Sequence, residues 1–131
     1  MMASMDRAQA EAFVDGWVQG WNARDLVQVL GHIADDVVFT SPVAAQLLEG
    51  SDGVIRGEAA LREDWSEASM HPDLRFDLLG VYVGLSTLVM NYRNQKGVLV
   101  NEVLAFDGHL VTHGHGSYLG SDANPAGAAP R

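Results

Sequence analysis

The sequence predicts an α+β fold in which three N-terminal helices pack on a strongly curved, mostly antiparallel sheet. In the first half of the chain, apolar residues recur with the helical period. In the second half, β-branched and aromatic segments alternate with turn residues. Because the helices come first and the strands follow one another, an alternating βαβ arrangement is excluded. We expect one domain over residues 1–119, followed by a disordered Gly/Ala/Pro-rich tail over 120–131.

Three helices are predicted in the first half. The first spans 7–22, where large apolar residues recur every four positions. Asp25 is a suitable N-cap for a second helix, whose apolar stripe extends to Ile33. The segment "DVVFTSP" then reads as a short strand, and a third helix is expected over 58–70. Between this strand and the last helix, the segment 43–56 fits either a lid over a pocket or an extra strand at the sheet edge.

The second half predicts four consecutive antiparallel strands. They are "LRFDLLGVYVG", "STLVMNYRN", "GVLVNEVLAFDG" and "HLVTHGHGSYL", with "NQKG" and "DG" as hairpin turns. The third strand is apolar on both faces, whereas the helices can cover only one face of a bent sheet. We therefore expect the other face to form a homodimer.

The charge and composition of the chain narrow the classes of molecule that it can bind. The chain carries 17 acidic and 8 basic residues, a net charge of −9, and this repels nucleic acid. It contains no cysteine, which rules out disulfides and thiolate chemistry and agrees with an expected cytoplasmic location. Since no apolar run approaches the roughly 20 residues of a membrane span, no membrane association is expected.

Three segments carry a resemblance to a known family: "WNARDLVQVLGHIADDVVFTSP", "IRGEAALREDW" and "NEVLAFDGHLV". Together they resemble the NTF2-like superfamily, which includes ketosteroid isomerases and SnoaL-like polyketide cyclases. The resemblance implies a cone in which the helices close one end of the curved sheet around a mostly apolar pocket. The implied ligand is a small apolar organic molecule.

The steroid isomerases of this superfamily allow a test residue by residue. Their general base, an aspartate before a proline, corresponds to Ser41, and their oxyanion-hole tyrosine corresponds to Trp17. Neither replacement can exchange protons usefully near neutral pH. Their second oxyanion donor corresponds to Glu102, so a carboxyl group is retained only there. The resemblance therefore argues against steroid isomerisation by that mechanism.

The stretch "HLVTHGHGSY" places His113, His115 and Ser117 on one side of a strand, because residues two apart share a face. The resemblance implies that this side faces the pocket, as does Glu102. The remaining pocket lining is expected from the following residues: Trp17, Phe39, Ser41, Asp64, Trp65, Leu88, Met90, Tyr92, Leu104 and Ser117.

Three interpretations of Glu102, His113 and His115 remain open. They could form a proton-transfer site, in which Glu102 shuttles the proton and a histidine polarises the substrate oxygen. They could bind a metal as a two-histidine, one-carboxylate set. They could also only satisfy one another beside a bound ligand.

The function predicted from these alternatives is binding of a small molecule without a cofactor or a metal. As an enzyme, the protein would be an isomerase, cyclase or dehydratase that acts on an apolar carbonyl compound by proton transfer. The alternative is a non-catalytic module for ligand binding or dimerisation.

Overall fold

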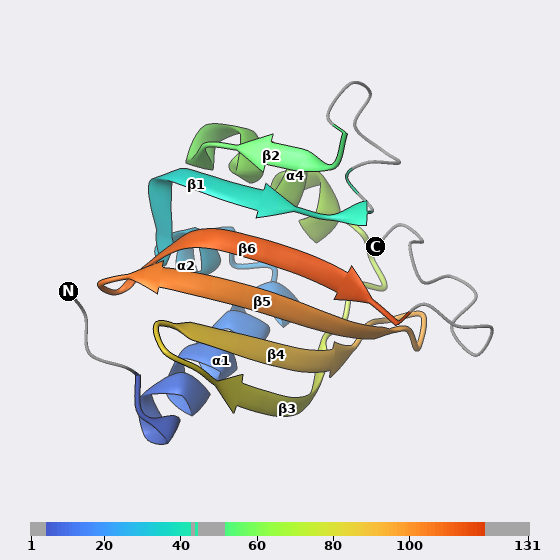
Figure 1. Ribbon diagram of the computed structural model, residues 1–131. Coiled ribbons are helices and arrows are strands. Elements are labelled where there is room, and N and C mark those ends of the chain that lie inside the picture. Colours follow the sequence, from blue (N-terminus) through green and yellow to red (C-terminus); the bar gives the residue numbers. More distant parts are fainter. Residues whose placement is uncertain (1–4, 43, 45–51, 120–131) are drawn as a thin grey trace.

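A computed structural model of the chain describes residues 5–42, 44 and 52–119. These residues form one sheet of six strands in the order β2-β1-β6-β5-β4-β3, with helices beside it (Figure 1). The elements are α1 (Arg7–Asn22), α2 (Leu26–Leu30), β1 (Ile33–Thr40), β2 (Val54–Arg56), α4 (Glu58–Ser69), β3 (Asp77–Val83), β4 (Thr87–Arg93), β5 (Leu99–Asp107) and β6 (Leu110–Tyr118).

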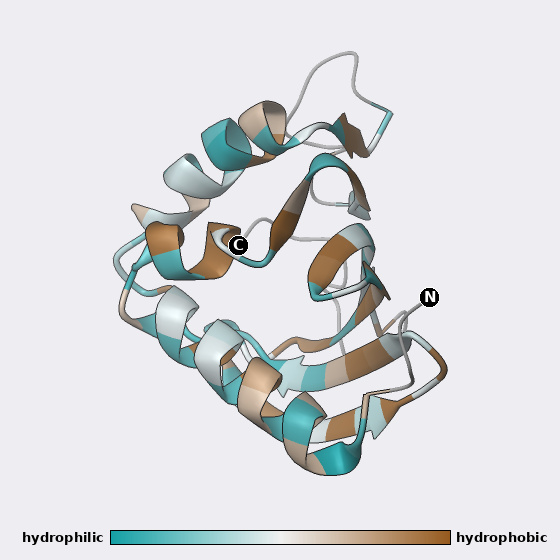
Figure 2. Ribbon diagram, turned by 90° about the vertical axis from the view of Figure 1, so that its left-hand side faces the viewer, coloured by the Kyte–Doolittle hydropathy of each residue, from teal (hydrophilic) through white to brown (hydrophobic). Residues whose placement is uncertain are grey.

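The helices lie on one side of a curved, open sheet. Figure 2 shows the helices along that side, and brown segments mark the apolar residues of the strands. The other side carries no described element (Figure 1). This confirms the predicted α+β architecture. None of the described helices is both long and apolar enough to cross a membrane.

The helix boundaries follow local capping. Asp6 accepts a hydrogen bond from the Gln9 backbone N–H at 2.8 Å, and the Gln9 side chain accepts one from the Asp6 N–H at 3.0 Å. This capping box starts α1 at the predicted residue. Asp25 caps α2 as predicted, but the helix ends at Leu30 and Ile33 opens β1. The prediction of one stripe reaching Ile33 was therefore wrong, because Ile33 is buried from a strand.

Strand β1 joins the two halves of the chain. It pairs in parallel with β6 and antiparallel with the short edge strand β2. The expectation of an extra edge strand is thus met at Val54–Arg56. The alternative of a lid concerned the whole segment 43–56, of which 43 and 45–51 lie outside the described residues, as does the predicted disordered tail over 120–131.

An aromatic cluster fills the space between the helices and the sheet. The ring of Trp65 on α4 meets Trp17, Trp21 and Phe39 edge-on, at centroid distances of 5.6, 5.1 and 5.1 Å. Edge-to-face packing at these distances is favourable beyond the area it buries. Because these rings come from α1, α4 and β1, the cluster fixes both helices over the same end of the sheet.

Candidate functional site

A cavity of about 40 Å³ lies between α4, the end of α1 and the inner face of the sheet. One water needs roughly 10–15 Å³ measured in this way, so the cavity suits a compact group of about three to four water-sized positions. The described residues that line it are Trp21, Phe39, Ser41, Ile55, Asp64, Trp65, Phe76, Tyr92, Glu102, Gly116 and Tyr118.

Two carboxylates from different elements line this cavity. Asp64 projects from α4 and is only 7% exposed; among the described residues it is the one charged side chain that is fully buried. Glu102 lies in the middle of β5, opposite Gly116 of β6. Carboxylates are common acid/base groups in enzyme sites. As the two carboxylates of the described lining, Asp64 and Glu102 are the leading candidates for chemistry in this cavity.

Two glycines make room for this arrangement. Gly114 is the cross-strand partner of Phe39, and a Cβ atom there would collide with the Phe39 ring. At Gly116, a Cβ atom would lie 3.9 Å from Oε2 of Glu102 and 3.8 Å from Oγ of Ser41, which is ordinary contact. Gly114 is thus required for packing, whereas Gly116 leaves open space beside the Glu102 carboxylate.

The far wall of the cavity is aromatic and held in place by polar contacts. Phe76 stacks on Tyr92 at 4.3 Å with an interplanar angle of 8°, and on Trp21 at 5.6 Å. The Asn22 side chain donates to the Phe76 carbonyl at 3.0 Å and accepts from its N–H at 2.8 Å. This double hydrogen bond ties the end of α1 to the segment before β3 and so positions the Phe76 ring.

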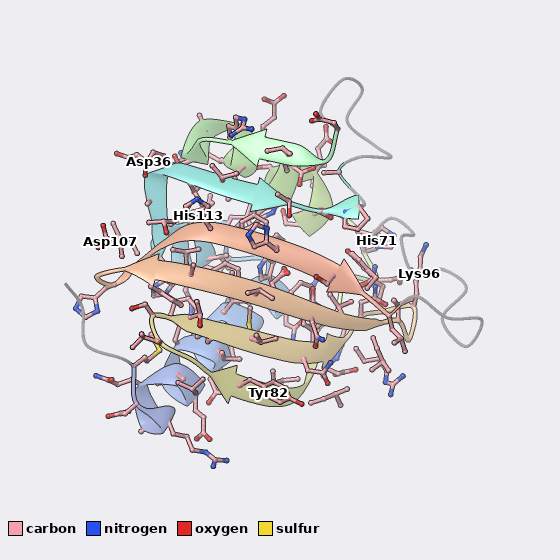
Figure 3. All side chains as sticks on the ribbon, in the orientation of Figure 1. Asp36, His71, Tyr82, Lys96, Asp107 and His113 are labelled. Atoms are coloured by element: carbon pink, nitrogen blue, oxygen red, sulfur yellow. The ribbon has the colours of Figure 1, made fainter. Side chains whose placement is uncertain are left out.

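The histidines lie on the opposite face of the sheet. His115 belongs to a cross-strand row that runs from Tyr82 through Val89 and Val103 to Thr40. The adjacent row, which contains Glu102 and Gly116, faces the cavity. His113, labelled in Figure 3, and His115 are exposed. The prediction that both share the pocket face with Glu102 was therefore wrong.

A one-residue bulge explains the error. In the β5–β6 hairpin, Phe106 pairs with Val111, but Ala105 pairs with His113, so Thr112 is an extra residue on β6. Without it, continuous pairing from the turn would set Glu102 opposite His115. A shift of one residue sends every following side chain to the other face. The bulge thus turns the glycines inward and the histidines outward.

The outer histidines make local contacts instead. Nδ1 of His115 lies 2.7 Å from the Thr40 hydroxyl, and Nδ1 of His113 lies 3.2 Å from the Thr112 hydroxyl. Because Glu102 is on the other face, the proposed metal set of Glu102, His113 and His115 is not brought together. Among the described residues, no group of three His, Asp or Glu side chains is placed to hold a metal ion.

The other predicted pocket residues divide into three groups. Phe39, Ser41, Asp64, Trp65 and Tyr92 do line the cavity. Ser117 is exposed on the histidine face, for the same reason of register. The remaining predicted residues face inward but lie in the hydrophobic core instead of the cavity wall: Trp17, Leu88, Met90 and Leu104.

Five lining residues were missed from the sequence. The signal for Trp21 was present, since it follows Trp17 by one helical turn. Gly116 and Tyr118 required the bulge to be known, and Phe76 precedes its strand and is placed by Asn22. Ile55 lies on the edge strand β2 that the sequence left undecided.

A curved sheet with helices over one face and a cavity between them defines the class as NTF2-like. A SnoaL-like protein of unknown function from Burkholderia thailandensis shares this structure with a TM-score of 0.84 and 33% identity, over 89% of this chain and 99% of that one. An NTF2-like protein of unknown function from Mesorhizobium loti gives 0.67 and 20%, over 88% and 95%. A "putative polyketide cyclase" from Sinorhizobium meliloti gives 0.66 and 13%, over 80% and 93%.

The family itself follows from the sequence match. The SnoaL-like domain model matches residues 14–119, which is most of the chain. The chain therefore belongs to the SnoaL-like family, and the resemblance drawn from its sequence is confirmed. No curated protein matches it.

Proposed function

We propose that this protein binds a small, largely apolar organic molecule in the cavity and catalyses proton transfer on it, with Glu102 as the acid/base. The observation that carries the proposal is that two carboxylates and six aromatic residues line the same cavity. Carboxylates in such surroundings are suited to acid/base work near neutral pH. The histidines have no part in it, because they lie on the other face of the sheet.

The proposed step is an isomerisation that uses no cofactor. The Glu102 carboxylate removes a proton from a carbon next to an electron-withdrawing group, such as a carbonyl, and the electron pair moves into that group. The same carboxyl group then returns the proton to another carbon, so that atoms and charge balance. Gly116 supports this role, because its missing side chain leaves the substrate room beside Oε2 of Glu102.

Asp64 has a supporting role in this proposal. It reaches the cavity from α4, whereas Glu102 reaches it from the sheet, so the two carboxylates come from facing elements. The two carboxylates can therefore act on the same molecule from opposite sides.

We further propose that the outer face of the sheet joins two copies into a homodimer. The half-buried Val89 and Val103 and the 65% exposed Tyr82 occupy neighbouring positions of one cross-strand row on that face. Large contiguous apolar patches are uncommon on the surface of monomers. A two-fold interface would cover this row with the same row of a second copy.

Hydrogen–deuterium exchange tests the catalytic proposal even while the natural substrate is unidentified. The protein is incubated in D₂O with a panel of small ketones and enones, and loss of the α-proton signals is followed by NMR. We expect exchange with at least one compound, and Glu102→Gln should slow it by about 10²–10⁴-fold.

A matched variant separates chemistry from general charge effects. Glu63→Gln makes the same chemical change at an exposed position of α4, next to Asp64, and should retain full exchange. Binding without exchange in the unmodified protein would identify a ligand-binding module instead of an enzyme. Exchange that survives Glu102→Gln would overturn the assigned role.

A further inference from the structure

Phe76 lies outside the helices and strands that carry most of the cavity lining. Among the described lining residues this holds for Ser41 and Phe76, and Phe76 comes one residue before β3 begins. Phe76 is nevertheless only 7% exposed, and its ring stacks on the rings of Tyr92 and Trp21. Its position therefore depends on contacts other than the pairing of strands.

The side chain of Asn22 supplies the contacts that a neighbouring strand would otherwise make. The N–H of Phe76 donates to the Asn22 amide oxygen at 2.8 Å, and the Asn22 amide nitrogen donates to the Phe76 carbonyl at 3.0 Å. A carboxamide both donates and accepts, whereas a carboxylate only accepts and an aliphatic side chain does neither. The residue type at position 22 is therefore matched to both backbone groups of Phe76.

The position of Phe76 limits the size of the group that the cavity can hold. The cavity measures about 40 Å³, whereas an apolar cavity that binds benzene measures roughly 150 Å³. A six-membered ring therefore does not fit while Phe76 is in place. Without the Phe76 ring, a ring-sized space next to Tyr92 and Trp21 would be added to the cavity that all three residues line.

We propose that Asn22 is a positioning residue that acts through Phe76, restricts the cavity to the narrow end of an unbranched molecule and excludes a ring. This inference rests on the proposed function, because it names the shape of the molecule on which the site would act. The unbranched end of a carbonyl compound would lie beside Glu102, and Phe76 would keep a cyclic compound away from the same carboxylate.

Benzene tests this size limit without requiring catalysis. Its binding to the unmodified protein and to two variants is measured by calorimetry. Phe76→Ala should bind benzene at least about tenfold more tightly than the unmodified protein, because benzene can replace the missing ring. Asn22→Leu, which is nearly isosteric, should have an affinity between these two. Its Phe76 ring would leave the observed position only part of the time, and the apparent affinity falls with that fraction.

Arg24→Met is the matched control, because Arg24 holds the same irregular segment at other residues. Its guanidinium donates at 3.0, 2.9 and 3.3 Å to the carbonyls of His71, Pro72 and Leu74. Loss of these hydrogen bonds should lower the stability of the protein but leave benzene binding as weak as in the unmodified protein. A purely structural role for Asn22 would make Asn22→Leu behave in the same way as this control.

NMR contacts between the ring protons of Phe76 and Tyr92 measure the position of Phe76 directly. They should weaken in Asn22→Leu and persist in Arg24→Met. Full contacts in Asn22→Leu would overturn the inference, as would benzene binding to the unmodified protein that is as tight as binding to Phe76→Ala. If benzene binds as expected but no ketone or enone undergoes exchange, the proposed function fails and the size limit set by Asn22 stands.

Discussion

The two faces of β6 differ in almost every property, although their residues alternate along one strand. On the inner face, Gly114 and Gly116 bring the backbone close to an aromatic ring and to a carboxylate. On the outer face, His113 and His115 are exposed and contact threonine hydroxyls. On β6 the two histidines are thus on the face without the cavity, whereas glycines occupy two positions on the face toward the helices.

This difference shows that the absence of a side chain can matter more to the structure around a site than a reactive side chain nearby. A strand of histidines looks functional in a sequence, whereas glycines are usually attributed to flexibility. Here Gly114 is needed because the ring of Phe39 occupies the position of its absent Cβ atom.

The largest expected effect comes from filling that position. Gly114→Ala places a methyl group inside the Phe39 ring, so the strands β1 and β6 must separate or the ring must leave its rotamer. We expect a loss of about 3 kcal/mol in the free energy of unfolding, measured by urea denaturation. Gly116→Ala is the matched control and should cost less than about 1 kcal/mol, because its Cβ atom has ordinary contacts. Equal effects would show that the two positions are not distinguished by packing.

A second effect is expected on the outer face. Val103→Lys places a charge in the middle of the proposed dimer interface, once in each copy. We expect the dissociation constant of the dimer to rise by about a hundredfold or more, measured by light scattering over a concentration series. Val27→Lys, at an 85% exposed position of α2, should leave it unchanged. A monomer in the unmodified protein at micromolar concentration would mean that no such interface exists.

Smaller effects on stability are expected from substitutions of His113 and His115. His115→Ala removes the contact with Thr40, and His113→Ala removes one with Thr112. Since both are at the surface, each should cost less than about 1 kcal/mol in unfolding free energy. Ligand binding in the cavity should be unchanged in both variants, as measured by calorimetry. Loss of binding in either would show that the outer face communicates with the cavity.

The smallest effect on stability is expected from His32. His32 is half-buried, its ring meets Phe13 edge-on at 4.9 Å, and burial lowers its pKa below the usual 6.5. The unfolded chain therefore takes up the proton first as the pH falls. The stability linked to His32 is complete above about pH 6.5 and declines below it, until the folded protein is protonated too. His32→Gln should flatten this part of the curve of unfolding free energy against pH. A curve unchanged by the substitution would remove His32 as its cause.

Much of the fold was predictable because it depends on local patterns. The helical spacing of Trp17 and Trp21 and the hairpin turns gave elements close to those observed. The family resemblance added the inward direction of Glu102 and the place of Asp64 near the cavity. These features need only the period of a helix or strand and the order of the elements.

Which residues of β6 point toward the cavity was not predictable in the same way. Their assignment depends on whether Thr112 pairs or bulges, and a single residue decides it. No local preference of the sequence marks this position, and in the folded sheet the register after the bulge places Gly114 against Phe39. That contact joins residues far apart in the chain, so the packing of the whole sheet selects the register.

The pairing of β1 with β6 also has a consequence for the growing chain. Thr40 and His115, which touch in the folded protein, are 75 residues apart in sequence. While the ribosome makes the intervening segments, Phe39 and the other rings near it lack the strand that will cover them. Such late, distant pairing slows folding and leaves apolar surface open to association with other chains. Strand β6 supplies Gly116 and Tyr118 to the cavity wall, so the cavity cannot close until synthesis has passed Tyr118.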